Sequence, residues 1–327
     1  MLPVPRRVLI TGVSGQDGWY TAAACLARGD EVHGTVRPGS GAPVPEGVAT
    51  HPVDLAAPAG LAELVRTLRP THVFHLAAPT FVPASWEDPS GVLRQIAEAT
   101  AAVLAACVAV EARVWVATSS EVFGDCGSSP QHEGTPMRPR SPYGIAKLAA
   151  HGLVGAMRAR HRLFACSGIT FNHESPRRPE RFLPRKVTRG AAALALGRIE
   201  RLSLGSLDAV RDWSHAEDVA ACALLALEHR EPGDYVVASG EGRTVRDLVT
   251  AAFAAAGLAT DELALRRQVE VDPRFVRPPE PVPLVGDPSR ARSVLGWSPR
   301  WTFEAMVGEM VEADLAALRR EAGIGGG

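Results

Sequence analysis

The sequence predicts an α/β protein with a Rossmann-type, doubly wound parallel sheet and a smaller α/β lobe in its C-terminal part. Two observations lead to this prediction. Short apolar strands alternate with helical segments through the first half of the 327-residue chain, and such connections produce right-handed crossovers between parallel strands. In addition, three glycines directly follow the first strand and open a helix, where dinucleotide-binding loops are usually found.

The expected elements follow in order along the chain. Short runs rich in apolar and β-branched residues predict strands, and longer runs with a helical spacing of apolar residues predict helices. The expected strands are 7–10, 31–36, 48–53, 71–77, 113–117 and 163–171. The first expected helix follows the glycines and ends near residue 28, and further helices are expected near 58–68, 89–109 and 303–320. Ser141 and Pro142 suit the cap and first turn of another helix.

Beyond Asn172 the alternation of strands and helices becomes weaker. Arginine and proline cluster at 174–186, and prolines recur at 278–283. We therefore predict two domains. Residues 1–172, with about 209–239, form a nucleotide-binding domain, and residues 173–208 and 240–327 form a smaller substrate-binding lobe.

The composition limits the classes of partner. The chain is 46% hydrophobic and 22% charged, with a net charge of -1, so it lacks the positive field that nucleic acid or a membrane surface would attract. We expect a small neutral-to-anionic molecule as its partner. The start of the chain lacks an apolar signal segment, and we expect no run long enough to span a bilayer.

The five cysteines are scattered without CxxC or histidine-rich spacing. This pattern argues against a zinc site or a disulfide framework, and it favours a reducing cytoplasm. Cys126 follows Glu121 by five residues, which places a second acid/base within reach in principle. Because cysteine is commonly a small buried apolar residue, we favour a structural role for Cys126.

The glycine loop and the strand ends after it predict a dinucleotide site. Glycine at three positions allows a tight turn and the close approach of a pyrophosphate to a helix N-terminus. An arginine after the second strand suits the 2′-phosphate of NADP, although an exposed loop arginine is a competing explanation. The expected cofactor-binding residues are Gly12, Gly15, Gln16, Asp17, Gly18, Arg37, Asp54, Leu55, Leu76, Ala77 and Ala78.

Only two of the 35 basic residues are lysines, Lys147 and Lys186. Lys147 follows Tyr143 by four residues, so that on a helix both side chains share one face. We expect the ammonium to lower the pKa of Tyr143 and make it a base near neutral pH. A solvated surface lysine is the alternative for this spacing alone, but the scarcity of lysine favours the functional interpretation.

Two further polar side chains follow the strand at 113–117, at the edge where open parallel sheets bind their ligands. Ser119 would hydrogen-bond the reacting oxygen, and Glu121 would be an acid/base for a second carbon. Because a plain alcohol dehydrogenase needs only Tyr143, Lys147 and Ser119, Glu121 suggests that oxidation is coupled to a further step.

Nearly the whole chain resembles the extended short-chain dehydrogenases/reductases, and among them the GDP-mannose 4,6-dehydratases. The resemblance rests on Thr11 to Gly18, Ser119 to Gly124, Arg140 to Gly144, Leu204 to Asp208 and Arg211 to Trp213. Its most specific segments are Phe171-Asn172-His173-Glu174-Ser175-Pro176-Arg177-Arg178 and Pro184-Arg185-Lys186. The first of these separates this branch from dTDP-glucose dehydratases.

The resemblance implies bound NADP, a GDP-sugar substrate and a homo-oligomer, a dimer or a tetramer. It adds His173 and Arg178 to the cofactor-binding residues, besides Tyr143 and Lys147. The residues implied for the GDP-sugar are Thr80, Asn172, Lys186, Arg211, Arg277 and Glu280. Arginine forks suit the diphosphate, and Glu280 would accept hydrogen bonds from ribose. For Arg177 and Arg185, the sequence does not decide between a surface charge and a binding role.

The sequence departs from the family pattern at several positions near the expected nicotinamide and hexose. Pro79, Thr80 and Phe81 replace Gln-Ser-His, Gly91 replaces a tyrosine, and Ile96 replaces an acid or amide. Ser119 replaces threonine but keeps the hydroxyl, and the loop after the second strand has lost a double arginine.

We therefore expect an intramolecular redox dehydration of a GDP-hexose at carbons 4, 5 and 6. A nucleotide-sugar epimerase or 4-ketosugar reductase on the same scaffold is the alternative. Glu121 argues against the reductase, whereas the altered segment 79–81 keeps the epimerase in consideration. A non-catalytic NADP-binding protein is disfavoured, because the four catalytic side chains are all present.

Overall fold

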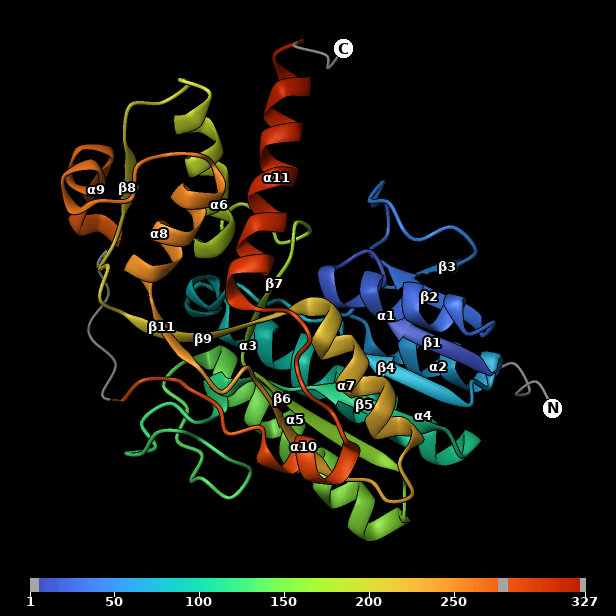
Figure 1. The fold of residues 1–327 in the computed structure, drawn as a ribbon. Coiled ribbons are helices and arrows are strands. Elements are labelled where there is room, and N and C mark those ends of the chain that lie inside the picture. The colour runs from blue at the N-terminus through green and yellow to red at the C-terminus, as the bar shows by residue number, and fades with distance from the viewer. Residues whose placement is uncertain (1–5, 276–281, 324–327) are drawn as a thin grey trace.

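The large domain is built on a seven-stranded parallel sheet. The computed structural model describes residues 6–275 and 282–323 (Figure 1). The strand order is β10-β6-β5-β4-β1-β2-β3, and each neighbouring pair is parallel. The strands are β1 (Arg7–Thr11), β2 (Glu31–Val36), β3 (Ala49–Pro52), β4 (His72–His75), β5 (Arg113–Ala117), β6 (Ala165–Thr170) and β10 (Asp234–Val237). The order changes direction at β1 and β4, which places a ligand crevice at their carboxyl ends.

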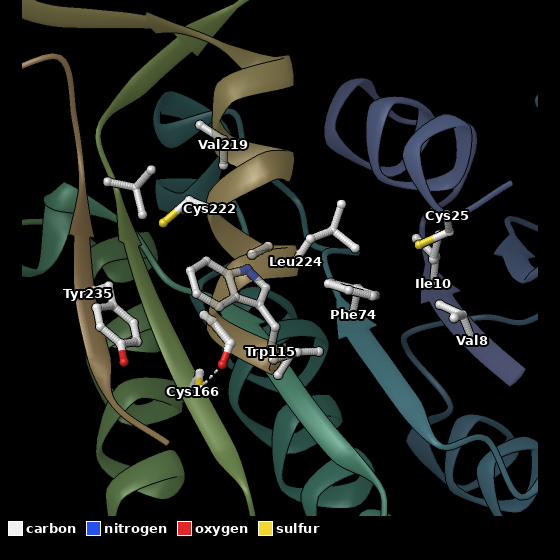
Figure 2. Packing of buried hydrophobic residues seen from close by; sticks show 14 of the residues in the cluster. Val8, Ile10, Cys25, Phe74, Trp115, Cys166, Val219, Cys222, Leu224 and Tyr235 are labelled. Atoms are coloured by element: carbon white, nitrogen blue, oxygen red, sulfur yellow. Dashed lines mark hydrogen bonds between the residues drawn. The ribbon is translucent and has the colours of Figure 1, made fainter. Parts of the chain in front are cut away.

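Helices cover both faces of this sheet. The pair on one face is α1 (Gln16–Ala27) and α7 (Ala216–Glu228), which pack against each other. On the other face α4 (Ala99–Val110) packs between α2 (Pro58–Leu68) and α5 (Pro142–His161). Figure 2 shows the core between the sheet and α7, where the buried Trp115 lies among Cys166, Cys222 and Leu224. A Cβ on Gly168 would lie 1.9 Å from the Trp115 ring, so this layer requires glycine on the neighbouring strand.

The described part of the second lobe contains three main helices, the short helix α9 and two small sheets. The sheets are formed by β7 (Asn172–Glu174), β9 (Val210–His215) and β11 (Gly242–Thr244), and by β8 (Leu202–Leu204) and β12 (Val269–Val271). The main helices α6 (Leu183–Ala195), α8 (Val245–Ala255) and α11 (Phe303–Glu321) pack around a separate apolar cluster. Short elements complete the chain: α9 (Glu262–Gln268), α10 (Ser289–Leu295) and the 3₁₀ turns η1 (Val82–Trp86), η3 (Ser120–Val122) and η4 (Pro273–Phe275).

The expected strands and helices of the first half are confirmed, with ends that differ by a few residues. Ser141 caps α5 as expected, because its hydroxyl accepts a hydrogen bond from the Gly144 amide. Beyond Asn172 the structure contains several strands and helices that the sequence reading left unassigned. Four of the described strands there are three residues long, too short to show an apolar alternation.

The segments around the predicted domain boundary contact both parts of the molecule. Within 209–239, β9 joins the small sheet, whereas α7 and β10 join the large domain. Ala291 and Trp297 pack into the core of the large domain, although they follow most of the second lobe in sequence. The chain thus crosses between the two parts more than once.

The expected helix 89–109 has a wider turn in its middle. It consists of α3 (Pro89–Leu93), a π-helical turn η2 (Arg94–Glu98) and α4. By length and composition, Pro89–Val110 is apolar enough to cross a membrane, so the expectation that no run reaches this length is wrong. The apolar residues Val103 and Leu104 are buried in the cluster that joins α4 to the sheet and α2, so packing within the protein accounts for them.

All five cysteines are unpaired and buried. Cys126 lies in an apolar cluster with Val122, Phe123 and Phe171. Its thiol donates to the carbonyl of Ser128 at 3.1 Å. These contacts agree with a structural role.

Candidate active site

The glycine loop joins β1 to α1 through a very close backbone turn. Gly12 has a φ of 73°, and a Cβ there would lie 3.0 Å from the Cα of Ala77. A Cβ on Gly18 would lie 2.3 Å from the carbonyl oxygen of Gly12. Side chains at these two positions would force the turn open, so the close turn requires glycine at both ends of the loop.

The N-terminus of α1 suits a phosphate. The helix begins after Gly15, which is the N-cap residue and provides no side chain to accept from the first amides. Such uncapped amides, together with the positive end of the helix dipole, bind anions. The loop therefore fits the pyrophosphate of a dinucleotide.

The first turn of α1 is linked to β7 by polar contacts that the sequence reading did not foresee. His173 Nε2 lies 3.0 Å from both carboxylate oxygens of Asp17. Gln16 donates to the carbonyl of His173 at 2.9 Å and accepts from Ser175 at 2.8 Å. Three residues expected to bind the cofactor thus contact each other and connect the two parts of the chain.

The contact between Asp17 and His173 favours the charged form of each side chain. Burial alone would lower the pKa of His173, but the Asp17 carboxylate outweighs this and raises it. Burial alone would raise the pKa of Asp17, but His173 and Arg178 lower it. The imidazolium and the carboxylate therefore stabilise each other where β7 meets the first turn of α1.

The ends of β3 and β4 form the rest of the predicted cofactor rim. The Thr11 hydroxyl accepts from the amides of Leu76 and Ala77, both at 3.0 Å, which holds the ends of β1 and β4 together. Beyond β3, Asp54 accepts from the amide of Ala56 at 2.9 Å, and the next residue, Leu55, packs partly buried against the core.

Tyr143, Ser119 and Glu121 converge at the carboxyl ends of β5 and β6. Tyr143 is in the first turn of α5 and is 8% exposed. Ser119 forms a hydrogen bond with it, and Glu121 and Arg178 are near enough to influence its pKa. Three of the predicted groups therefore share one site, as expected for residues at a common sheet edge.

The expected acidification of Tyr143 by Lys147 is not observed. Burial raises the pKa of Tyr143 to about 12, and the Ser119 hydrogen bond offsets this only in part. Lys147 Nζ lies 5.8 Å from the centroid of the Tyr143 ring and donates to the carbonyl of Ala117 at 2.6 Å. Burial also lowers the pKa of Lys147 to about 8. Desolvation of both groups thus exceeds the attraction that the helical spacing suggested.

A pocket of about 320 Å³ opens beside Tyr143. It brings together four of the predicted residues, Arg37, Ala78, Thr80 and Tyr143. The lining also includes residues that the sequence reading did not select, namely Pro79, Phe81, Ala84, Ser85, Asp88, Val92, Gln95 and Arg181. Of these, Gln95 lies in the π-helical turn η2, which a helical pattern in the sequence does not reveal.

The residues expected to bind the sugar nucleotide lie in the second lobe. Asn172 and Arg211 are on the adjacent strands β7 and β9. Lys186, on α6, places its ammonium 3.7 Å from the ring centroid of Phe275. Arg277 and Glu280 lie outside the described residues.

The arginines of 177–185 divide into different environments. Arg185 forms an ion pair with Asp314, 2.7 Å away and fully buried, on α11. This contact answers the open question about Arg185 in favour of a structural role. Arg177 lies over the Trp19 ring at 3.4 Å, and Arg178 pairs with the buried Glu174 at 3.2 Å.

Comparison with known proteins decides the family. The family described as GDP-mannose 4,6 dehydratase matches residues 9–310. The GDP-mannose 4,6 dehydratase 2 of Caenorhabditis elegans is 36% identical over 343 residues, which cover 96% of this chain and 90% of that protein. The chain belongs to the GDP-mannose 4,6-dehydratase family.

Similar solved structures support the fold and a nicotinamide cofactor. The UDP-glucose 4-epimerase of Thermus thermophilus, solved in complex with NAD, is similar with a TM-score of 0.82 and 29% identity. RMD from Pseudomonas aeruginosa, complexed with NADPH, gives a TM-score of 0.79 and 25% identity. Both alignments cover 95% of this chain and 99% of the other. The family reaction is that of a hydro-lyase.

Proposed function

We propose that this protein removes water from a GDP-hexose, most simply GDP-mannose, and forms a GDP-4-keto-6-deoxyhexose with bound NADP. One observation carries the proposal. Glu121 lies beside the Tyr143–Ser119 pair, within the range in which its charge acts on the phenol. A second acid/base next to an alcohol-oxidising pair is what elimination requires and simple oxidation does not.

The residues divide the proton transfers between them. Tyr143 takes the proton of the carbon-4 hydroxyl, and Ser119 hydrogen-bonds the same oxygen as it becomes a ketone. The ketone acidifies carbon 5, from which Glu121 takes a proton and then delivers it to the carbon-6 hydroxyl, which leaves as water. Tyr143 returns its proton to carbon 5 at the end. NADP, held by the glycine loop at the start of α1, would supply a hydride acceptor for carbon 4 and the same hydride for carbon 6, so that the reaction would consume no net oxidant.

The buried Tyr143 needs positive charge before it can act as a base. Its pKa of about 12 leaves the phenol protonated at neutral pH. The charge of Arg178 already lowers the pKa of Tyr143 in part. The Lys147 ammonium lies 5.8 Å from the centroid of the Tyr143 ring and donates to the carbonyl of Ala117. A ribose hydroxyl between Lys147 and Tyr143 would connect the two, and a charged nicotinamide would act in the same direction.

Three features support NADP and a nucleotide diphosphate. Arg37 follows β2, where the 2′-substituent of the adenosine ribose is recognised in Rossmann folds. The uncapped α1 suits the pyrophosphate of the cofactor. In the second lobe, the Lys186 ammonium over Phe275 offers a cation beside an aromatic face, which suits a phosphate and a base.

We further propose a cytoplasmic homo-oligomer that binds neither nucleic acid nor membrane. Five unpaired buried cysteines support a reducing compartment. The net charge of -1 supports a small-molecule partner rather than a polyanion.

Glu121→Gln tests the proposal. Glutamine keeps the size of the side chain but cannot take the carbon-5 proton, whereas oxidation at carbon 4 depends on Tyr143. With GDP-mannose, we expect the absorbance of bound NADPH to rise and decay slowly, and water loss to slow by about 10²–10⁴-fold. Mass spectrometry of the product measures the water loss. The rate at which solvent deuterium is incorporated at carbon 5 should fall in parallel.

Glu304→Gln is the control, because it removes an exposed carboxylate from the first turn of α11. Dehydration at the wild-type rate by Glu121→Gln would remove the main support for a dehydratase. A product of unchanged mass from the wild-type protein would indicate epimerisation instead.

A further inference from the structure

Two arginines from different parts of the chain line the pocket beside Tyr143. Arg37 directly follows β2 in the large domain, and Arg181 lies between β7 and α6 in the second lobe. Both are exposed. Within 6–275 and 282–323, neither Arg37 nor Arg181 forms an ion pair. The pocket therefore carries two positive charges that no described side chain neutralises.

Aromatic rings hold Arg181 in this position. Its guanidinium carbon lies 5.4 Å from the ring centroids of both Phe81 and Phe182. These two rings pack edge to face, with centroids 5.7 Å apart, and so join the loop after β4 to the start of α6. An aromatic ring contacts the face of a guanidinium and leaves its N–H edge for an anion. The contacts thus orient Arg181 without using its hydrogen-bond donors.

The single acid of the lining does not offset this charge. Asp88 caps α3, and its Oδ1 accepts from the Gly91 amide at 2.9 Å and from the Ser90 hydroxyl at 3.1 Å. These bonds lower the pKa of Asp88, so it stays ionised. One carboxylate and two guanidinium groups leave a net positive lining that favours an anionic ligand.

We propose that Arg37 and Arg181 together bind the 2′-phosphate of NADP as a two-sided clamp. A phosphate monoester carries about −1.5 to −2 charges at neutral pH, which two guanidinium groups match. The 2′-phosphate is favoured over other phosphates because Arg37 occupies the end of β2. The inference rests on the proposed NADP dependence and adds Arg181, on a segment more than a hundred residues away in sequence.

The clamp has a consequence for substrate binding. Arg181 lies five residues before Lys186, and α6 begins between them. A 2′-phosphate held by Arg181 would therefore fix the start of the helix that carries Lys186. NADP, but not NAD, would order the substrate side of the site. The diphosphate of the sugar nucleotide is also an anion that Arg181 could bind. The experiment therefore has to distinguish binding of the 2′-phosphate of NADP from binding of this diphosphate.

The test measures the dissociation constants of NADPH, NADH, 2′,5′-ADP and GDP for the wild-type protein and for Arg181→Gln. Loss of a charged hydrogen-bond partner costs about 1.5–3 kcal/mol, or roughly 10–150-fold in affinity. We expect NADPH and 2′,5′-ADP to weaken by that factor, while NADH and GDP keep their wild-type affinities. Arg37→Gln should show the same pattern, and Arg66→Gln, on the exposed face of α2, should change none of the four.

The outcomes separate this inference from the proposed function. A wild-type protein that binds NADH as tightly as NADPH would overturn both. Wild-type preference for NADPH with an unchanged Arg181→Gln would leave NADP in place and overturn the clamp. Weaker GDP binding with unchanged 2′,5′-ADP binding would assign Arg181 to the substrate and equally overturn the clamp.

Discussion

Replacing Lys147 by methionine should stabilise the cofactor-free protein at neutral pH. Lys147 is 5% exposed, and burial lowers the pKa of its ammonium from 10.5 to about 8. A lysine whose pKa is lower in the folded state binds its proton more weakly there than in the unfolded chain. The charge therefore destabilises the fold at every pH at which the unfolded lysine is protonated.

The magnitude follows from the pKa. A change from 10.5 to about 8 corresponds to about 3 kcal/mol of destabilisation, fully present below pH 8. It decreases as the pH rises from 8 towards 10.5, because the folded protein then loses its proton first. Methionine also removes the hydrogen bond to the carbonyl of Ala117, which costs about 1 kcal/mol. The expected net gain is about 2 kcal/mol at pH 7 and close to zero near pH 10.

The assay is urea unfolding of cofactor-free protein at pH 7 and pH 10, with wild type and variant compared at the same pH. Lys186→Met is a matched control, because it removes the other lysine of the chain, which is only partly buried. Its free energy of unfolding should change much less. A Lys147→Met protein that is less stable than wild type at pH 7 would refute the reasoning, as would a gain of the same size at pH 10.

Two further predictions concern the reaction. Tyr143→Phe should retain NADP but lose hydride transfer from carbon 4, since the binding groups remain and the base is gone. The measurement is the absorbance of NADPH after GDP-mannose is added, and a rise in this absorbance would contradict the prediction. Lys186→Ala should raise the KM for the sugar nucleotide by about 10-fold or more and leave the Kd of NADPH nearly unchanged, because its ammonium lies over Phe275, on α6 and away from the glycine loop. An unchanged KM would show that Lys186 does not contribute to substrate binding.

Local features of the sequence were sufficient for the large domain and for much of the site. The glycine loop could be placed because backbone crowding at Gly12 and Gly18 leaves few other choices of residue. Ser119, Glu121 and Tyr143 could be grouped, since parallel strands bring their carboxyl ends to one edge. The second lobe was harder to predict, because strands as short as β8 and β11 are defined by their pairing with distant segments.

The sequence by itself determined the order of strands and helices in the first half of the chain, the position of the glycine loop and the choice of candidate catalytic side chains, because each depends on residues that are neighbours in the chain. Only the tertiary structure decided the charge state and the partners of those side chains. Burial raises the pKa of Tyr143 and lowers that of Lys147, although their helical spacing suggested the opposite for the tyrosine. Asp17 pairs with His173, and Arg37 shares a pocket with Arg181, across more than a hundred residues in both cases. Desolvation and long-range contacts depend on the packed interior, which no local pattern encodes.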